Sequence, residues 1–580
     1  MTDFQKDNSI PKKRILTRVL NSFSRKQIIA FTIFFLALVT STVSMLGRIN
    51  KNFIVYLPEN GGKLTEGIVS APRFLNPVLA LSDTDRDISG LIYSGLMKKM
   101  PDGSIVNDLA ESYTVSPDNL TYTFRIKDDA KFHDNSAVTA QDIIFTVGKI
   151  KDSTIKSPLQ AVWQGVLVEE GQNNPRIVVF KLSSAYSSFL DNVTVGILPK
   201  HIWESLDSEE FNLSKFNMKA IGAGPYKISN IAEKKNGLIE EIDLTSFNNY
   251  AGEKPFIRKI NFKFFKNEAD LIKAYRRGKI DQISSIDPAS AKKLMDQGFS
   301  PTTAVLSRIF GLFLNPNQNN LLRDKDIVQA IELGIDKEKI VQDVLYGFGV
   351  AITSPIPKSL AGEDFEELKN INVEENRASA EKILDNKGWK KNESGIRTKD
   401  GKKLSFSIST ADVNELRGSA ESIKEDLALI GIEVNVKIFE IGILNQNIIR
   451  PRDYEALLFG EVVRNQSDLF AFWHSSQRND PGLNVAVYTN SKVDKLLEEL
   501  IGTTNESDRK TKLQGLETQI KEDRPAIFLY SPEFIYMESP KIKNVELDNL
   551  TSSSERFLGV SDWYIREDAV WNFWPKQKID

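Results

Sequence analysis

Histidine is the side chain most suited to hold zinc or move a proton at neutral pH, and this chain has three of them. His133, His201 and His474 are far apart in the sequence and none lies in an H-E-x-x-H motif, which excludes a zinc protease of that type. The G-x-S-x-G motif of serine hydrolases and the Walker A motif of nucleotide-binding loops are also missing. A hydrolase is the enzyme alternative, and no nucleophile–base pair supports it. We therefore predict a protein that is not an enzyme and has no metal site or cofactor.

Composition describes a folded chain of more than one domain. Of its 580 residues, 41% are hydrophobic and 26% are charged. Cysteine is absent, which excludes disulfides, thiolate metal sites, cysteine nucleophiles and a lipid-modified cysteine as a membrane tether. The formal net charge is −3 although the first 27 residues are basic, so the rest of the chain is acidic and nucleic acid is an unsuitable partner.

The N-terminus has the pattern of a membrane anchor. Residues 1–27 carry seven Lys or Arg against two Asp, and residues 28–46 are nineteen residues without a charge, close to the roughly 20 that cross a bilayer. The basic flank predicts a cytoplasmic tail over 1–27 and an extracytoplasmic chain after Gly47. The alternatives are a cleaved signal peptide and a buried helix of a soluble protein. Because the stretch exceeds a typical signal core and no A-x-A-like site follows it, we favour an uncleaved signal-anchor over 28–46.

Local patterns in the middle of the chain predict both strands and helices. Residues 120–127 alternate apolar and polar, as a strand with one buried face does, and residues 113–115 are its expected hairpin partner. Thr139 and Asp142 have the spacing of a capping box that opens a helix. The pattern of residues 421–438 predicts a helix, a glycine that ends this helix, and a strand that follows it. Helices alternating with strands predict an α/β lobe with parallel pairs.

The segment from 109 to 150 resembles the family 5 extracytoplasmic solute-binding proteins of ABC importers, which include dipeptide- and oligopeptide-binding proteins. The matching stretches are LAESYTVS at 109–116, TYTFRIK at 121–127, KFHD at 131–134 and TAQDIIF at 139–145. Tyr113 replaces the usual Trp, and Asn135 replaces the usual Gly at a turn that Asn tolerates. Further segments of this chain match other motifs of the family in the same order along the sequence, so the resemblance spans roughly residues 65–535.

Two smaller features of the resemblance carry structural predictions. His133 lies in a family structural motif, and we expect a core hydrogen-bonding residue there and not a catalyst. Gly222 and Gly224 match the family's G-T-G-P-Y segment, and two glycines around one residue suggest backbone held where a side chain would clash. A simple turn into a strand and proximity to the ligand both remain open for this segment.

The resemblance implies an α/β, two-lobed periplasmic-binding-protein-like fold of class II, with an extra subdomain in lobe I, behind an N-terminal transmembrane helix. Two strands, near 304–315 and 525–532, would cross between the lobes. The domains expected from this resemblance are a tail at 1–27, an anchor at 28–46, lobe I at 50–308 with a subdomain at about 95–215, lobe II at 309–528 and a return to lobe I at 529–580.

The resemblance also implies a ligand site on lobe II. Peptide-binding members have an Asp shortly after a strand that pairs with the peptide's α-ammonium, and here Glu461 is the nearest acid and Asp468 the next. Either can supply the charge that a desolvated ammonium requires, or both are solvated loop acids. Arg464 either faces a carboxylate of the ligand or lies at the protein surface. The aromatic cluster around Trp473 either belongs to the hydrophobic core or forms a wall of the ligand pocket. The candidate ligand-binding residues are Asn76, Phe459, Glu461, Arg464, Asp468 and Trp473.

The function implied is that of a monomeric, membrane-anchored extracytoplasmic receptor of an ABC importer. It would capture peptides in the cleft between its lobes, close about the hinge, and deliver them to permease subunits in the membrane. One alternative is a receptor for a non-peptide solute such as a nickel chelate, haem, a sugar or an opine. Another is a surface interaction or sensing module that does not take part in transport.

Overall fold

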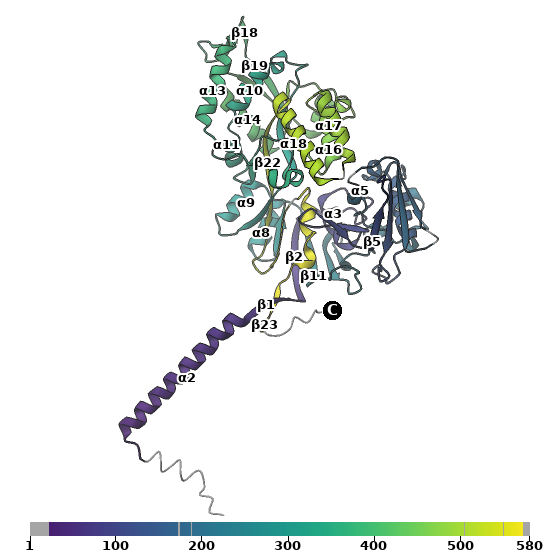
Figure 1. Cartoon of the computed structure of the whole chain (residues 1–580), viewed down its shortest axis with the longest axis vertical. Coiled ribbons are helices and arrows are strands. Elements are labelled where there is room, and N and C mark those ends of the chain that lie inside the picture. The colour runs from purple at the N-terminus through teal and green to yellow at the C-terminus, as the bar shows by residue number, and fades with distance from the viewer. Residues whose placement is uncertain (1–21, 172–173, 187, 504, 549, 572–580) are drawn as a thin grey trace, which may run out of the picture. The chain divides into compact units, whose positions relative to one another are not determined.

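The computed structural model describes residues 22–571, apart from residues 172–173, 187, 504 and 549 (Figure 1). Most of the tail predicted over 1–27, and the last nine residues of the return segment, lie outside the described residues. The chain forms two units: residues 1–59 with 566–580, called unit 1 here, and residues 60–565, called unit 2.

Unit 1 is a long apolar helix followed by a two-stranded ribbon. Helix α2 (Arg25–Phe53) leads directly into β1 (Ile54–Glu59), which pairs antiparallel with β23 (Arg566–Trp571). Within the described residues, α2 is the one helix long and apolar enough to cross a bilayer, a test that a signal sequence also passes. None of the side chains in its apolar window is buried, whereas the core helix of a soluble protein is mostly buried.

Unit 2 is organised around a mixed sheet of twelve strands, in which the order β20-β19-β21-β14-β22-β12-β2-β11-β10-β9 is extended by β13 and β15, both paired to β22. The strands on one side of β22 are β2 (Gly61–Val69), β9 (Tyr226–Glu233), β10 (Ile239–Ser246), β11 (Ile257–Phe265), β12 (Gln282–Ser284) and β13 (Pro301–Val305). Those on the other side are β14 (Arg308–Leu314), β15 (Gly349–Ala351), β19 (Ser405–Ala411), β20 (Glu433–Phe439) and β21 (Ala456–Val462).

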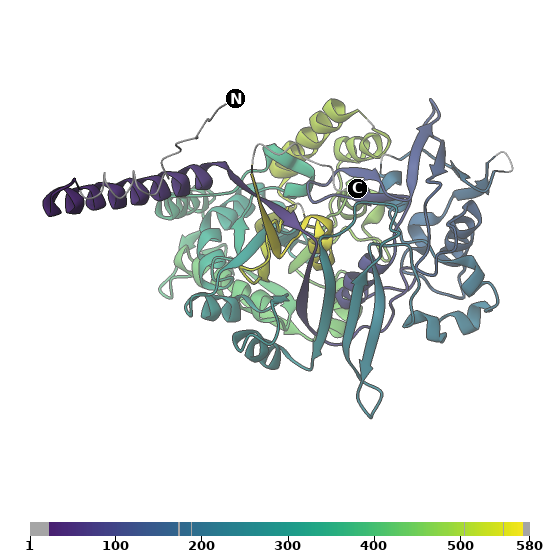
Figure 2. The same ribbon diagram turned by 90° about the horizontal axis from the view of Figure 1, so that it is seen from below.

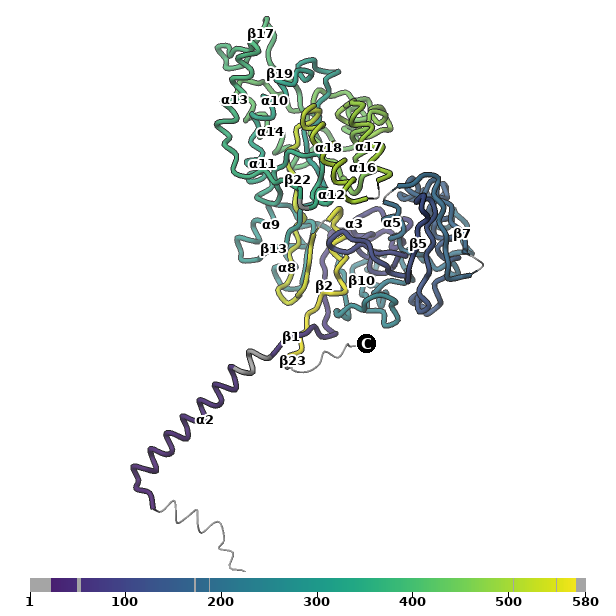
Figure 3. The backbone as a smooth tube through the Cα atoms, viewed as in Figure 1, coloured from purple at the N-terminus to yellow at the C-terminus, as the bar shows by residue number. Residues whose placement is uncertain are grey.

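Strand β22 (Ala526–Met537) belongs to two hydrophobic cores and so joins two lobes. Its first half pairs with β14, while its second half pairs with β13, from Glu533 to Met537 (Figure 3). Lobe I is built on the core that includes Leu64 and Phe262, and lobe II on the core that runs from Ile309 to Tyr530. The chain therefore crosses between the lobes twice, once from β13 to β14 and once along β22. The second crossing extends five residues beyond the predicted position 532.

In lobe II, helices cover the strands on both faces. In Figure 1, α10, α11, α13 and α14 lie on one side of β22, and α16, α17 and α18 lie on the other. Strands β19 and β20 are parallel and flank α14, which confirms the predicted helix–stop–strand order. The elements of this lobe outside the twelve-stranded sheet are η3 (Asn320–Arg323), α10 (Lys325–Gly334), α11 (Lys337–Asp343), α12 (Lys358–Ala361), η4 (Gly362–Asp364), α13 (Val373–Asn386), β16 (Lys390–Lys391), β17 (Arg397–Lys399), β18 (Lys402–Lys403), α14 (Asn414–Leu429), α15 (Ile441–Ile443), η5 (Leu444–Ile449), α16 (Gln466–Trp473), η6 (Ser475–Gln477), α17 (Ser491–Gly502) and α18 (Glu506–Asp523).

Lobe I carries a second, four-stranded antiparallel sheet in the order β5-β6-β8-β7. Figure 2 shows this blue part of the chain grouped to one side of unit 2. The elements of lobe I outside the twelve-stranded sheet are α3 (Asp83–Ile92), β3 (Met97–Lys99), β4 (Ile105–Asn107), β5 (Ala110–Val115), β6 (Thr121–Ile126), α4 (Ala140–Lys151), η1 (Gln160–Trp163), β7 (Val166–Glu170), β8 (Ile177–Leu182), α5 (Phe189–Asn192), α6 (Lys200–Trp203), α7 (Ser208–Phe211), η2 (Lys215–Asn217), α8 (Glu268–Arg276), α9 (Pro288–Met295), η7 (Ser553–Phe557) and η8 (Val560–Asp562).

The local predictions for this sheet are confirmed. Strand β6 buries its apolar face, with Phe124 and Ile126 fully buried, and pairs with β5 as a hairpin. The backbone N–H of Thr139 donates to Asp142 Oδ2 at 2.8 Å, which completes the capping box at the start of α4. Asn135 has φ = +71°, the left-handed conformation that Asn tolerates in place of the family's Gly.

His133 and the two glycines of the 222–226 segment form one buried contact with the end of α3. The Nδ1 of His133 accepts from the Gly222 N–H at 3.3 Å, and its Nε2 lies 3.1 Å from the Gly224 carbonyl oxygen, so the proton resides on Nε2. Burial lowers the pKa of His133 to about 4 and keeps the ring neutral. This confirms His133 as a core hydrogen-bonding residue.

We expect Gly222→Ala to lower the free energy of unfolding by about 1–3 kcal/mol, the usual cost of overpacking. A Cβ at this position would lie 2.1 Å from the carbonyl oxygen of Ile92, and backbone cannot move aside as a side-chain end can. Gly90→Ala is the matched control on exposed α3 surface, where a Cβ meets nothing within 4 Å, and there we expect a gain of roughly 0.5–1 kcal/mol. Urea titration of both variants measures the difference; equal stabilities would contradict the clash.

Candidate ligand-binding site

Glu461 lies near the end of β21 and is buried without a charged or hydrogen-bonding partner among the described residues. Its backbone is opposite Ile309 of β14, the strand that enters lobe II from lobe I. The residue is 5% exposed, and no hydrogen-bond donor or cation among the described residues acts on its carboxylate. Burial raises the pKa of Glu461 well above its ordinary value of 4.5. A buried carboxyl group without a counter-charge among the described residues is suited to accept a cationic group from a ligand.

The groups around Glu461 do not neutralise it. The hydroxyl of Tyr454 interacts electrostatically with Glu461 but donates its hydrogen bond to the carbonyl oxygen of Val485. At the C-cap of α16, the helix that follows β21, the ring of His474 is bonded to Ser476 and Glu498. No positive side chain is thus directed at the Glu461 carboxylate within the described part of the chain.

Asp468 and Arg464, by contrast, bind one another. Arg464 donates from Nε and Nη2 to the two carboxylate oxygens of Asp468, each at 3.1 Å, and its backbone N–H adds a third bond at 2.8 Å. Asn465 caps α16 between them by accepting from the N–H groups of Ser467 and Asp468. The Arg464 side chain remains 65% exposed. Asp468 therefore already has a cation, which distinguishes it from Glu461.

The two aromatic candidates differ in burial. Trp473, at the end of α16, is 1% exposed and packs against the rings of Phe313 and Phe528, while its indole N–H has no acceptor among the described residues. Phe459 of β21 is half-buried at the margin of the same core. The aromatic cluster of the sequence is thus largely lobe II core, with Phe459 nearer to its surface.

Asn76 lies in lobe I and is fully buried. Its Oδ1 accepts from the N–H of Val78 at 2.9 Å, and its Nδ2 donates to Asn217 at 3.1 Å. These bonds stabilise the turn after β2 and connect it to η2. Five of the six candidates therefore belong to one β21–α16 segment, and Asn76 is separate from them.

Hollows elsewhere on unit 2 do not coincide with these residues. One, of about 280 Å³, is lined by Glu338, Val350 and Lys369 together with their neighbours. Another, of about 270 Å³, lies between α9 and the start of α14, near Tyr346. The described residues contain no group of three or more His, Cys, Asp or Glu placed to hold a metal ion.

Sequence reasoning missed a buried charge cluster in lobe I. The guanidinium of Arg556 binds both carboxylate oxygens of Asp87, each at 2.8 Å, and Glu66 at 3.1 Å, and all three side chains are buried. The hydroxyl of Tyr536, on β22, lies 2.8 Å from Glu66 and 2.6 Å from Gln282. The cluster joins the return segment at η7 to β2, α3 and the crossing strand. Single charged residues separated by hundreds of positions give no local signal that they meet.

Arg308 is a second residue that sequence reasoning did not select. It begins β14 opposite Val462, and its buried Nε has no hydrogen-bond acceptor among the described residues. The charge of Arg308 also acts on Asp83 in lobe I. Burial alone would raise the pKa of Asp83. Hydrogen bonds from Arg86 and Ser553, together with the charges of Arg86 and Arg308, outweigh burial and lower this pKa. Arg308 is thus a cation at the point where the chain passes between the lobes.

Two lobes that share one crossing strand are the architecture of two-lobed solute-binding receptors. The family model described as bacterial extracellular solute-binding proteins, family 5, middle, matches residues 104–481. The chain belongs to this family of ABC-importer receptors, and its homologues are solute-binding proteins, not enzymes. It is an extracytoplasmic solute-binding domain with one N-terminal apolar helix.

Three comparisons give the extent of the likeness. The oligopeptide-binding protein AppA of Bacillus subtilis (strain 168) is 30% identical over 487 residues, which are 82% of this chain and 87% of that protein. The structure of AppA from Bacillus subtilis in complex with a nonapeptide matches with a TM-score of 0.64 at 27% identity, over 88% of this chain and 100% of that one. NikZ from Campylobacter jejuni in complex with Ni(L-His) matches with a TM-score of 0.65 at 26% identity, over 87% of this chain and 99% of that one.

Proposed function

We propose that this protein is the membrane-anchored, extracytoplasmic receptor of an ABC importer and that it captures peptides between its two lobes. The observation that carries the proposal is the likeness to AppA, which extends over the whole length of a structure solved with a nonapeptide. The shared β22 and the β13–β14 passage support a hinge about which the lobes close on a ligand. The lobe limits in this proposal are 50–308, including a subdomain at about 95–215, and 529–580 for lobe I, and 309–528 for lobe II.

Glu461 is the residue that we propose to bind the peptide's α-ammonium. The unpaired, buried carboxylate supports this role, whereas Asp468 is occupied by Arg464. Phe459 and Trp473 are proposed walls for ligand side chains, Arg464 is a proposed partner for a ligand carboxylate at the exposed rim, and Asn76 supports the lobe I side of the cleft.

We also propose that α2 stays on the mature protein as a single-pass anchor, with the basic N-terminal tail in the cytoplasm. The basic flank and the exposed apolar side chains of α2 support this orientation. The anchor would keep a monomeric receptor beside its permease, which raises the effective concentration of the receptor without any new contact.

A nickel chelate is the second candidate ligand. NikZ, solved with Ni(L-His), is as similar to this chain as the AppA structure is, in both identity and TM-score. Such a metal would be cargo enclosed in its chelate. Glu461 would then face a cationic part of the chelate and not a peptide ammonium.

Native mass spectrometry of the full chain, purified gently in mild detergent, tests the proposal. We expect a ladder of small bound masses that fragment as peptides. A single mass with the isotope pattern of nickel would replace peptide by chelate and leave the receptor assignment in place. An empty protein that also ignores an added peptide pool would contradict ligand capture and favour an interaction module.

A further inference from the structure

Arg308 has a guanidinium without a partner at the passage between the lobes. It is the first residue of β14, the strand that carries the chain into lobe II. Its guanidinium makes no hydrogen bond or ion pair with a described residue, and its Nε is buried. A buried donor without an acceptor is costly, so a ligand atom that accepts from this group would remove the cost.

The register of β14 with β21 places the side chain of Arg308 on the more open face of the sheet. Directly opposite residues of an antiparallel pair lie on the same face, and consecutive residues lie on opposite faces. Arg308 is opposite Val462, which is 38% exposed, whereas Ile309, which is opposite Glu461, is fully buried. Arg308 and Glu461 therefore belong to different faces and do not compete for the same group of a ligand.

Arg308 lies between elements of both lobes. Its charge acts on Asp83, the first residue of α3 in lobe I. The residue before it, Ser307, donates from its N–H to the carbonyl oxygen of Leu550, in the segment that returns to lobe I, at 2.9 Å. On the lobe II side, the Oγ of Ser307 lies 2.6 Å from the Oγ of Ser359 on α12. Arg308 is thus placed where a ligand enclosed by the two lobes would meet it.

Acids on elements around Arg308 already bind other cations. These ion pairs are Asp83 with Arg86 on α3, Asp468 on α16 with Arg464, and Asp548 with Lys358 on α12. Arg464 offers less to a ligand than Arg308 does, because its Nε and Nη2 donate to Asp468. The donors of Arg308 form a planar fork that fits the two oxygens of a carboxylate, and no described residue occupies them.

We propose that Arg308 binds a carboxylate of the ligand, so that the receptor prefers peptides with a free C-terminus or an acidic side chain. The proposal rests on the capture of peptides between the lobes. A two-pronged contact between a guanidinium and a carboxylate adds affinity and fixes the orientation of the ligand. An amide in place of the carboxylate would leave the charge of Arg308 without a partner, so such a peptide should bind more weakly.

Retention of peptide pools by the full chain in mild detergent tests the proposal, with bound peptides counted by mass spectrometry after gel filtration. The first pool holds random pentapeptides without Asp or Glu and with amidated C-termini, so it has no carboxylate. The second has the same sequences with free C-termini, and the third is amidated but carries one Glu. We expect the chain to retain the second pool, the third or both about ten-fold or more better than the first. The pool that is preferred shows which carboxylate Arg308 binds.

Arg308→Gln should abolish this preference and leave retention of the first pool unchanged, which shows that the variant is folded. Arg308→Lys should keep part of the preference, because an ammonium retains the charge but lacks the planar fork. If Arg308→Gln does not fold, Arg308→Lys decides, and an unchanged preference in that variant would overturn the proposal.

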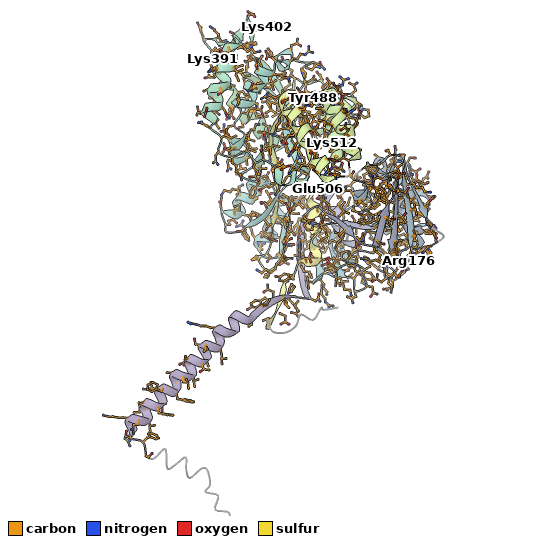
Figure 4. All side chains as sticks on the ribbon, viewed as in Figure 1. Arg176, Lys391, Lys402, Tyr488, Glu506 and Lys512 are labelled. Atoms are coloured by element: carbon orange, nitrogen blue, oxygen red, sulfur yellow. The ribbon has the colours of Figure 1, made fainter. Side chains whose placement is uncertain are left out.

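Two controls remove other positive charges. Arg464→Gln should reduce the preference by at most about five-fold, since that exposed guanidinium is held by Asp468. Lys402→Gln removes a charge from the exposed β18 strand at the far end of lobe II and should change nothing (Figure 4).

Three results would overturn the role of Arg308. Equal retention of all pools, or a preference that survives Arg308→Gln, would refute the carboxylate contact and leave peptide capture in place. An equal loss of every pool in Arg308→Gln and in Asp83→Asn would identify an ion pair that holds the lobes together and not a ligand contact. A chain that retains no pool would refute peptide capture itself, on which this role depends.

Discussion

Arg556→Met is expected to lower the free energy of unfolding of unit 2 by about 3–5 kcal/mol, the usual cost of removing one partner from a buried ion pair. The substitution keeps an apolar side chain of similar length against Phe557, whose ring lies 4.2 Å from the guanidinium, but it removes the only cation that contacts Asp87 and Glu66 among the described residues. Both carboxylates stay buried between β2, α3 and η7. Urea titration of the purified protein measures the loss.

The control for this variant is Arg417→Met. Arg417 lies on α14 with a side chain that is 46% exposed and paired to Asp412, so its loss should change stability by no more than about 0.5 kcal/mol. An Arg556 variant as stable as this control would show that the cluster contributes nothing to the fold. The variant that combines Arg556→Met with Glu66→Gln and Asp87→Asn should regain most of the lost stability, because no unpaired charge is then buried.

The pH dependence of the same cluster has a definite sign. Burial raises the pKa of Glu66 from 4.5 to about 7, although the charge of Arg556 and the Tyr536 hydroxyl act against it. A carboxyl whose pKa is raised by folding holds its proton more tightly in the folded state, so its contribution is fully present below about pH 4.5 and is lost as the pH rises through about 7. The deficit of Arg556→Met should accordingly be smaller at pH 5 than at pH 8.

Glu461→Gln is expected to weaken the binding of ligands with a free ammonium by about ten-fold or more, because a hydrogen bond to a charged group is worth roughly 1.5–3 kcal/mol. The glutamine keeps the volume and one oxygen acceptor but cannot supply the negative charge. Isothermal titration with a peptide and with its N-acetylated form separates the two effects, since the acetylated form should bind both proteins equally. Unchanged affinity for the free peptide would remove Glu461 from the site.

Asp468→Asn is the matched control, because Asp468 already pairs with the exposed Arg464, and exposed pairs contribute at most about 1 kcal/mol, or five-fold.

Proton release adds a second readout. The pKa of Glu461 is raised well above 4.5 by burial, so below that pKa a bound cation must displace the carboxyl proton. Affinity should then rise with pH, by up to about ten-fold per unit, and titrations in buffers of different ionisation enthalpy should report the released proton. Both effects should vanish in Glu461→Gln.

Features that depend on neighbours along the chain could be predicted from the amino-acid sequence. The alternation of residues 120–127 specified β6, the spacing of Thr139 and Asp142 specified the start of α4, and Asn135 occupies the left-handed position expected of it. Periodicity shows which face of an element is apolar, and capping needs only residues within one turn. The ordered family motifs likewise led to the correct family and the mixed α/β fold, because motifs keep their order whatever their spatial arrangement.

Which charged groups have partners depends on the tertiary structure. Glu461 and Asp468 are seven positions apart and equivalent by type, yet Glu461 is buried without a cation among the described residues, whereas Asp468 is held by Arg464. Arg556 meets Glu66 and Asp87 across more than 460 residues, and β23 pairs with β1, the strand that follows α2. Burial and pairing depend on contacts between distant segments, for which a single sequence contains no periodic signal.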